Sequence, residues 1–315
     1  MSKTSFLFPG QGSQYVGMGQ DLLEESPIAR DLFQRADDTL GFSLSKVMFG
    51  SGDTEADVAA LQKTENTQPA LYCHSMAVMA ILDAAGFGFE MTAGHSLGEY
   101  SALAAAGVLA FEDGLTLVRE RGRLMSEAGE RQPGTMAAII GMDDKDVEAV
   151  CSDVEVGVVQ PANFNSPGQV VISGDLDGVA KAMTLALDRG ARRAIQLPVS
   201  GAFHSPLMAH AREGLAEALA SVSLAAPRCP VYLNVTAAPE TDPEQIRQRL
   251  LDQLLSPVRW SQTLLAMHEH GAGIFVEVGA GRVLSGLVKR TLGREVKTAA
   301  IGTIQDISSY TALDA

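Results

Sequence analysis

The strongest constraint on the fold is the alternation of strand and helix patterns along most of the chain. Short apolar segments are each followed, after a turn, by a segment with apolar residues at helical spacing. The strands of this series are expected at 4–8, 91–94, 231–235, 274–278 and 297–301. Because strands that alternate with helices favour a parallel sheet covered on both faces, the sequence predicts the α/β class with a mostly parallel sheet.

The middle of the chain has a different order of elements, which predicts a second, smaller domain. From 135 to 197 the patterns run strand, helix, strand, strand, helix, strand, with Asn-Ser-Pro-Gly at 165–168 as the expected hairpin turn. This βαββαβ order is that of a ferredoxin-like unit. We therefore expect a small ferredoxin-like domain at 131–197, inserted into a large α/β domain formed by 1–130 and 198–315, with a substrate cleft between them.

The segment at 94–98 reads Gly-His-Ser-Leu-Gly and lies between the expected strand 91–94 and an alanine-rich helix at 99–106. In this context Gly-x-Ser-x-Gly is typical of a nucleophile elbow, which presents the serine hydroxyl above the sheet and beside free N–H groups at a helix N-terminus. Ser96 is therefore the predicted covalent nucleophile, and the elbow makes the expected large domain hydrolase-like. The alternative is a tight turn whose serine only caps the helix.

A serine nucleophile needs a base at neutral pH, and the chain offers six histidines. His204 is favoured because it lies in the loop between the expected small domain and the next helix, beside the expected cleft. The other histidines lie inside predicted helices, at a helix end, or next to Ser96 with the ring directed away: His74, His210, His268, His270 and His95. A loop histidine also fits a solvated or structural role, so the residues alone leave the base open.

Arg121 lies on the apolar side of an expected helix at 112–127. Its neighbours three and four positions away in both directions are Leu117, Val118, Leu124 and Met125. A guanidinium in such a position needs a partner, which is either a carboxylate of the protein or a carboxylate carried by a ligand. The sequence does not decide between these two partners.

A glycine-rich turn, Pro-Gly-Gln-Gly-Ser-Gln at 9–14, ends the first expected strand. It places the backbone N–H of Gln11 at the carboxyl end of the sheet, where α/β folds bind substrates, although a turn without any ligand fits the local sequence equally well. The turn lacks the Gly-Lys-Ser/Thr ending of a phosphate loop. His268 and His270 are too close to share a helix face, so no metal site is expected.

Composition restricts the partners and the compartment. A formal net charge of −14 disfavours nucleic acid and anionic lipid, so a partner with phosphates needs a local basic patch. Candidate patches are Arg119 with Arg121 and Arg123, Arg192 with Arg193, and Lys289 with Arg290. Three cysteines without close spacing suit a reducing compartment, and no apolar run is long enough to cross a bilayer. We expect a cytoplasmic protein without a membrane or nucleic-acid partner.

Taken together, several segments resemble the malonyl-CoA:acyl carrier protein transacylases nearly from end to end. They are Phe-Pro-Gly-Gln-Gly-Ser-Gln at 8–14, Gly-His-Ser-Leu-Gly-Glu-Tyr at 94–100, Arg121, Asn-Phe-Asn-Ser-Pro-Gly-Gln at 163–169, Gly-Ala-Phe-His-Ser at 201–205, Asp-Gln-Leu-Leu-Ser-Pro-Val-Arg-Trp at 252–260 and Glu-Val-Gly-Ala-Gly at 277–281. Each segment is weak alone, but their order and spacing together are specific. The resemblance implies an acyltransferase that carries malonyl groups for fatty acid synthesis.

The resemblance also implies a role for each catalytic residue. Ser96 carries the acyl group, His204 is its base, and the backbone carbonyl of Gln253 orients His204 in place of an acidic residue. The implied substrate-binding residues are Gln11 and Leu97, whose N–H groups form the oxyanion hole, and Arg121, which holds the malonyl carboxylate. Malonyl-CoA and the phosphopantetheine thiol of acyl carrier protein are then substrates, no cofactor is retained, and a monomer is expected.

Other functions stay open on the sequence. A serine esterase or thioesterase of the α/β-hydrolase type shares the elbow, but it leaves Arg121 and the inserted unit unexplained. A non-catalytic carrier-binding module is disfavoured by the intact Ser96, His204 and Arg121. Among transferases, the carrier of a polyketide pathway or of a malonate decarboxylase is an alternative acceptor.

Overall fold

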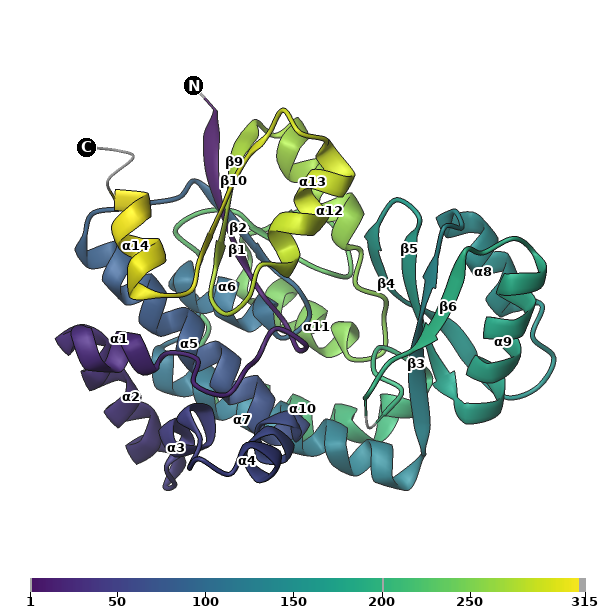
Figure 1. Cartoon of the computed structure of the whole chain (residues 1–315), viewed down its shortest axis with the longest axis horizontal. Coiled ribbons are helices and arrows are strands. Elements are labelled where there is room, and N and C mark those ends of the chain that lie inside the picture. Colours follow the sequence, from purple (N-terminus) through teal and green to yellow (C-terminus); the bar gives the residue numbers. More distant parts are fainter. Residues whose placement is uncertain (1, 200, 312–315) are drawn as a thin grey trace.

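Two β-sheets organise the chain, one mostly parallel and one antiparallel, and helices cover both (Figure 1). The structure is a computed structural model that describes residues 2–199 and 201–311. The antiparallel sheet lies at one end of the molecule, beside the helix-covered parallel sheet. The α/β class with a mostly parallel sheet, predicted from the alternating pattern, is confirmed.

The larger sheet has the strand order β10-β9-β1-β2-β7-β8 and is parallel except for the β7–β8 pair. Its strands are β1 (Lys3–Phe8), β2 (Met91–Gly94), β7 (Val231–Tyr232), β8 (Pro239–Glu240), β9 (Ala272–Val278) and β10 (Lys297–Ile301). The strand expected at 231–235 ends at Tyr232, because the backbone N–H of Ala237 bonds the carbonyl of Leu233 and closes a turn. The two-residue strand β8 is too short to leave a periodic signal in the sequence.

Successive residues of the central strand β1 are buried on opposite faces of the larger sheet. Phe6 and Phe8 belong to the main hydrophobic core, whereas Leu7 packs into a second cluster under helices α12 (Trp260–Glu269) and α13 (Val283–Leu292). The helices of the main core are α1 (Gln20–Glu25), α2 (Pro27–Leu40), α3 (Leu44–Phe49), α4 (Thr54–Gln62), α5 (Thr64–Ala84), α6 (Gly98–Ala105), α7 (Phe111–Arg131), α10 (Ala209–Ala220), α11 (Pro243–Gln253) and α14 (Ile304–Thr311). This alternation is what a sheet buried on both faces requires.

Helix α5 begins at Thr64 and continues through Pro69, although proline is normally confined to the first turn of a helix. Proline lacks the N–H that would bond the carbonyl four residues before it, here that of Glu65. Arg119 of α7 supplies the missing donor, with Nη1 2.6 Å from the Glu65 oxygen. This tertiary bond, invisible in the local sequence, allows the helix to run through the proline.

The smaller sheet has the strand order β4-β5-β3-β6 and all of its neighbours are antiparallel. Its elements are β3 (Gly134–Ile140), α8 (Asp144–Ser152), β4 (Val159–Ser166), β5 (Gln169–Asp175), α9 (Leu176–Asp188) and β6 (Arg193–Gln196). The hairpin expected at 165–168 is shorter, because Ser166 still pairs with Gln169 and leaves only Pro167 and Gly168 in the turn. A short 3₁₀ helix η1 (Pro206–Met208) follows the small sheet and leads into α10.

Alternate residues of β3 show how the small sheet is packed. Ala137 and Ile139 form a core with α8 and α9, whereas Met136 and Ala138 join the main core on the other face. One face of the small sheet therefore borders the rest of the molecule. Among residues 2–199 and 201–311, no helix is both long and apolar enough to cross a membrane.

Candidate active site

Ser96 lies in the sharp turn between β2 and α6, at the carboxyl end of the larger sheet. Its backbone adopts φ 51°, a left-handed conformation that is unusual for a residue with a side chain. Glycine is required on both sides: a Cβ on Gly94 would lie 1.8 Å from the carbonyl oxygen of Gly98, and a Cβ on Gly98 would lie 2.0 Å from that of Phe8. The turn thus has the close backbone packing and the strain of a nucleophile elbow.

His204 lies against Ser96, with Nε2 2.8 Å from the serine Oγ. Its Nδ1 is 2.8 Å from the backbone carbonyl oxygen of Gln253, which can only accept a hydrogen bond. Nδ1 therefore carries the proton, and the lone pair of Nε2 faces the serine hydroxyl. Burial, followed by the positive charge of Arg121, lowers the pKa of His204 to about 3, so the imidazole is a neutral acceptor near pH 7.

Arg121 extends from α7 to the other side of the Ser96 hydroxyl, and its side chain is buried. Nη2 donates to Ser96 Oγ at 3.2 Å and to Gln253 Oε1 at 2.9 Å, and Nη1 donates to Gln68 Oε1 at 2.8 Å. In the described part of the chain no carboxylate oxygen lies within 4.0 Å of this guanidinium. Burial lowers the pKa of Arg121, but a guanidinium stays protonated at neutral pH. The cavity therefore holds a positive charge that the described residues leave without a directly bonded anion.

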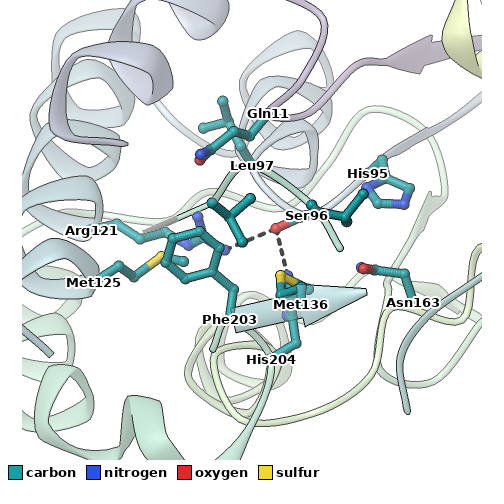
Figure 2. A pocket seen from close by; sticks show the side chains of 12 residues that line it. Gln11, His95, Ser96, Leu97, Arg121, Met125, Met136, Asn163, Phe203 and His204 are labelled. Atoms are coloured by element: carbon teal, nitrogen blue, oxygen red, sulfur yellow. Dashed lines mark hydrogen bonds between the residues drawn. The ribbon is translucent and has the colours of Figure 1, made fainter. Parts of the chain in front are cut away.

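A cavity of about 110 Å³ opens in front of these residues. Figure 2 shows Arg121 and His204 reaching the Ser96 hydroxyl from two sides, with Phe203 and Met125 beside them. The other lining residues are Gln11, His95, Leu97, Met136, Asn163, Leu197 and Val199. The cavity is therefore bounded both by the larger sheet and by strands β3 and β4 of the smaller one.

Gln11 and Leu97 both line this cavity. Leu97 is the residue before α6 and follows the nucleophile, while Gln11 follows β1, the neighbour of β2. Across the described residues neither N–H donates to a backbone carbonyl or to a side chain. Two unpaired donors beside a serine hydroxyl are suited to bind an oxygen that becomes negatively charged.

The six residues singled out in the sequence are thus brought together, and the other histidines are placed elsewhere or in other roles. His268 bonds the carbonyl of Ala272, and His270 bonds the hydroxyl of Tyr232. His74 is fully buried, and burial lowers its pKa to about 4. His95 lines the cavity but turns Nε2 to Asn165 Oδ1, 2.8 Å away. No cluster of three potential metal ligands occurs within 2–199 and 201–311.

Three polar residues of the site were missed in the sequence. Gln68 on α5 bonds Arg121, Gln160 on β4 donates Nε2 to the His204 carbonyl oxygen at 2.7 Å, and Asn234 bonds the backbone of the elbow. Asn234 could have been found, because it follows β7 and so lies at the same carboxyl edge as Gln11 and Ser96. Gln68 and Gln160 give no local signal, since each acts across the fold.

One cavity thus holds a serine at an elbow, a neutral histidine on its hydroxyl, and an arginine that has no carboxylate partner among the described residues. These features are typical of a serine-dependent enzyme that acts on acyl groups. A family model described as acyl transferase domain matches residues 5–311. The chain is 47% identical over 309 residues to a malonyl CoA-acyl carrier protein transacylase of Bacillus subtilis, covering 98% of this chain and 96% of that one. It belongs to the malonyl-CoA:acyl carrier protein transacylase family of acyltransferases.

Solved structures support the same assignment. An acyl carrier protein S-malonyltransferase of Vibrio cholerae superposes with a TM-score of 0.92 at 41% identity, covering 98% of this chain and 100% of that one. A malonyl-transacylase in complex with the holo form of a type II polyketide acyl carrier protein superposes with a TM-score of 0.93 at 39% identity, covering 99% and 100%. The sequence-based resemblance to this family is therefore confirmed.

Proposed function

We propose that this enzyme transfers the malonyl group of malonyl-CoA to the phosphopantetheine thiol of acyl carrier protein, through a malonyl ester on Ser96, and so supplies fatty acid synthesis. The observation that carries the proposal is Arg121. Its buried guanidinium has no carboxylate partner among the described residues and lies 3.2 Å from the nucleophile. A substrate with a free carboxylate two carbons from its thioester sulfur supplies that partner while the thioester carbon meets Ser96.

In the first half-reaction His204 removes the proton of Ser96 as Oγ attacks the thioester carbon of malonyl-CoA. The N–H groups of Gln11 and Leu97 bind the resulting oxyanion. When the intermediate collapses, the carbon–sulfur bond breaks, and the imidazolium returns its proton to the departing CoA thiolate. The product is a malonyl-Ser96 ester with neutral His204.

The second half-reaction repeats these steps with the carrier thiol as nucleophile. His204 takes the thiol proton, the sulfur attacks the ester carbon, and the proton passes to Ser96 Oγ as the carbon–oxygen bond breaks. Both substrates use one site in turn, so the kinetics are ping-pong. Gln253 acts twice, since its carbonyl orients His204 and its side chain donates Nε2 to the Ser96 carbonyl at 3.0 Å.

Selection of malonyl over methylmalonyl groups is a property we assign to Phe203. Its ring lines the cavity together with Met125 (Figure 2). We infer that the ring occupies the space that an α-methyl group on the acyl chain would need. One methyl group in such a pocket is worth about 1–3 kcal/mol, so methylmalonyl is discriminated against but not absolutely excluded.

The carrier protein docks, in our proposal, on a basic patch formed by Arg192, Arg193, Lys289 and Arg290, all exposed. Two pairs far apart in sequence meet at the β4–β5 hairpin. On one side of the hairpin, Arg290 Nη1 donates to Gln169 Oε1 at 2.6 Å. On the other side, the backbone N–H of Arg192 donates to the Ile140 carbonyl, and the N–H of the next residue, Gly141, donates to the carbonyl of Gly168 in the hairpin turn. On a chain with net charge −14, this patch offers the local positive field that an acidic carrier needs.

The patch predicts a selective kinetic effect. Replacing both Arg192 and Arg290 by glutamate raises KM for the carrier protein about tenfold and leaves KM for malonyl-CoA unchanged, because only the carrier contacts this surface. Arg30→Glu, an exposed charge reversal on α2, is the control. An unchanged carrier KM in the double variant would remove the patch from the proposal.

We also propose the finer description of the fold and the setting. The small sheet, with α8 and α9, is a ferredoxin-like unit inserted at 131–197 into a hydrolase-like large domain of 1–130 and 198–315; the order β4-β5-β3-β6 supports it. The enzyme works in the cytoplasm as a monomer and without a cofactor. The free cysteines Cys73, Cys151 and Cys229 suit a reducing compartment.

Intact-mass analysis after mixing with malonyl-CoA alone tests the proposed function. The expected result is one malonyl group per chain, absent in Ser96→Ala and discharged by the phosphopantetheine thiol of the fatty acid carrier. Rapid release of free malonate without a stable ester would instead indicate a thioesterase. Comparing discharge by a fatty acid carrier and by a polyketide carrier decides the acceptor, since one relative was solved with a polyketide carrier.

A further inference from the structure

The backbone N–H of Ser96 is not available to the substrate. It donates to Asn234 Oδ1 at a distance of 2.7 Å. Because this bond occupies the Ser96 N–H, that group is not free to bind an oxyanion. The N–H groups of Leu97 and Gln11 donate no hydrogen bond within the described part of the chain, so they are free for that role.

Asn234 is itself held at every polar group, and its side chain is completely buried. Its Nδ2 donates to the Gly94 carbonyl at 2.7 Å, its backbone N–H donates to Glu99 Oε2 at 2.6 Å, and its carbonyl accepts the N–H of Arg259 at 3.0 Å. The amide orientation is fixed, because Oδ1 must accept from Ser96 while Nδ2 donates to a carbonyl. The Asn234 side chain therefore connects the backbone of Ser96 to that of Gly94, two positions earlier.

The two hydrogen bonds of the Asn234 side chain hold the elbow at Gly94 and at Ser96, the residue of the elbow with the strained left-handed φ. A left-handed φ at a residue with a side chain costs free energy and persists only where the surroundings over-determine it. The strand β2 ends at Gly94 and helix α6 begins at Gly98, so Asn234 bonds the backbone on the strand side of the turn. Glu99, in the first turn of α6, completes the connection from the helix side.

We propose that Asn234, anchored by Glu99, is a positioning residue that holds Ser96 in its reactive backbone conformation and keeps the Ser96 N–H out of the oxyanion hole. The inference deepens the proposed function and relies on it for the choice of substrate. Neither residue touches the cavity, so both act through Ser96. Their removal lowers the rate constant of acylation rather than the affinity for malonyl-CoA.

Glu99 is suited to be a neutral anchor. It is fully buried, Oε1 has no partner among the described residues, and burial raises the pKa of its carboxyl to about 8. A protonated carboxyl still accepts the Asn234 N–H through its carbonyl oxygen. Glutamine has the same shape and the same acceptor, whereas alanine leaves that N–H unpaired in the interior.

The test measures the rate constant of single-turnover acylation of Ser96 by malonyl-CoA. The reaction is quenched at successive times, and the malonylated fraction is determined by intact mass over a range of malonyl-CoA concentrations. We expect Asn234→Ala to lower the maximal rate constant about 10²-fold, with the half-saturating concentration within twofold of the wild type. Thr92→Val is the matched control: it removes a buried hydrogen bond to the Phe6 carbonyl in the same sheet, and it should leave the rate constant unchanged. The reaction amplitude counts the folded fraction, so loss of stability alone does not imitate the effect.

Glu99 variants keep the proposal testable if Asn234→Ala does not fold. Glu99→Gln should acylate within threefold of the wild-type rate constant at pH 7, and Glu99→Ala about tenfold or more below it. Labelling of Ser96 by a fluorophosphonate, which needs no malonyl group, should follow the same order. If the wild-type enzyme is labelled by the fluorophosphonate but not malonylated, the proposed function is wrong and the positioning role is untouched. If Asn234→Ala or Glu99→Ala is acylated and labelled as fast as the wild type, the positioning role is wrong.

Discussion

The two sheets differ in what they bury. Among the described residues, every buried Asp, Glu, Lys, Arg or His belongs to the layers around the larger sheet, including Glu99, Arg121 and His204. The core between the smaller sheet and its helices is apolar, formed by residues such as Ile139, Val170 and Ile172. The smaller sheet adds to the site only neutral groups at its border, among them Met136, Asn163 and Gln160.

This difference separates chemistry from shape. Burying an ionisable group costs free energy unless it is bonded, and the larger sheet gathers such groups at its carboxyl edge, where burial shifts the pKa values of Glu99, Arg121 and His204 away from their ordinary values. The smaller sheet closes the cavity and supports His204 from behind without bringing a charge. Substitutions around the larger sheet should therefore change the rate constant of the reaction, whereas substitutions in the smaller sheet should mainly change the stability of the fold.

The largest effect on activity is expected at His204, one of the buried ionisable residues around the larger sheet. His204→Ala should lower kcat/KM for malonyl transfer by about 10³–10⁴, because no other group takes the proton of Ser96. Circular dichroism confirms that the variant is folded, and residual activity within tenfold of the wild type would exclude His204 as the base.

The pH dependence of the wild type tests the same residue. Only neutral His204 is a base, and its pKa of about 3 lies below the ordinary 6.5, so protonation removes activity only at strongly acidic pH. We expect kcat/KM to stay level from pH 7.5 down to about pH 5. A fall in kcat/KM below about pH 6.5 would mean that burial and Arg121 do not lower the pKa of His204.

Arg121 and Arg123, two positions apart on α7, provide the next largest contrast. Arg121→Gln should lower malonyl transfer about 10²–10³-fold and acetyl transfer much less, because only the malonyl carboxylate needs the guanidinium. Arg123 is half-buried, turned away from the cavity lining, and paired with Glu120 and Glu127, so Arg123→Gln should change both rates less than twofold. Equal losses of malonyl and acetyl transfer in Arg121→Gln would show that Arg121 is structural.

The sequence predicted the parts of the site that depend on local signals. Ser96 has an elbow with glycines at fixed positions, and Arg121 has an apolar helix face, so both are visible within a few residues. The base was left open by the residues and chosen through the family resemblance, as was Gln253. Asn234, 138 positions from Ser96, and Gln160, 44 positions from His204, act through contacts that only the tertiary fold creates.

The fold was predictable to a similar degree and for the same reason. The alternation of strands and helices predicted the parallel sheet, since periodicity is a local property. The start of α5 was not, because the bond from Arg119 that replaces the missing proline donor joins two helices. The end of β4 was also missed, because pairing of Ser166 with Gln169 overrides the turn preference of its sequence.

Gln160 is the residue of the smaller sheet with the largest expected effect on activity. Its Nε2 donates to the carbonyls of His204 and Leu255, and His204 holds a left-handed φ of 58°. Gln160→Leu leaves both carbonyls unpaired and loosens the base, so kcat should fall about tenfold with little change in KM. Gln196→Leu, which loses a hydrogen bond within the small sheet, is the control and should retain full kcat. Full activity in Gln160→Leu would mean that the small sheet shapes the cavity and nothing more.

The smallest effect on activity is expected in the apolar core of the small sheet. Ile172 on β5 is fully buried and packs toward α8 and α9, on the face of the sheet turned away from the cavity. Ile172→Val removes one methylene there and should lower the free energy of unfolding by about 0.5–1.5 kcal/mol, measured by denaturant titration, while kcat and KM stay within twofold. Because the same sheet carries Gln160 on β4, unequal outcomes in these two variants separate support of the base from packing. A large loss of kcat in folded Ile172→Val would show instead that the interior of the small sheet is coupled to the chemistry, and the division between the two sheets would then fail.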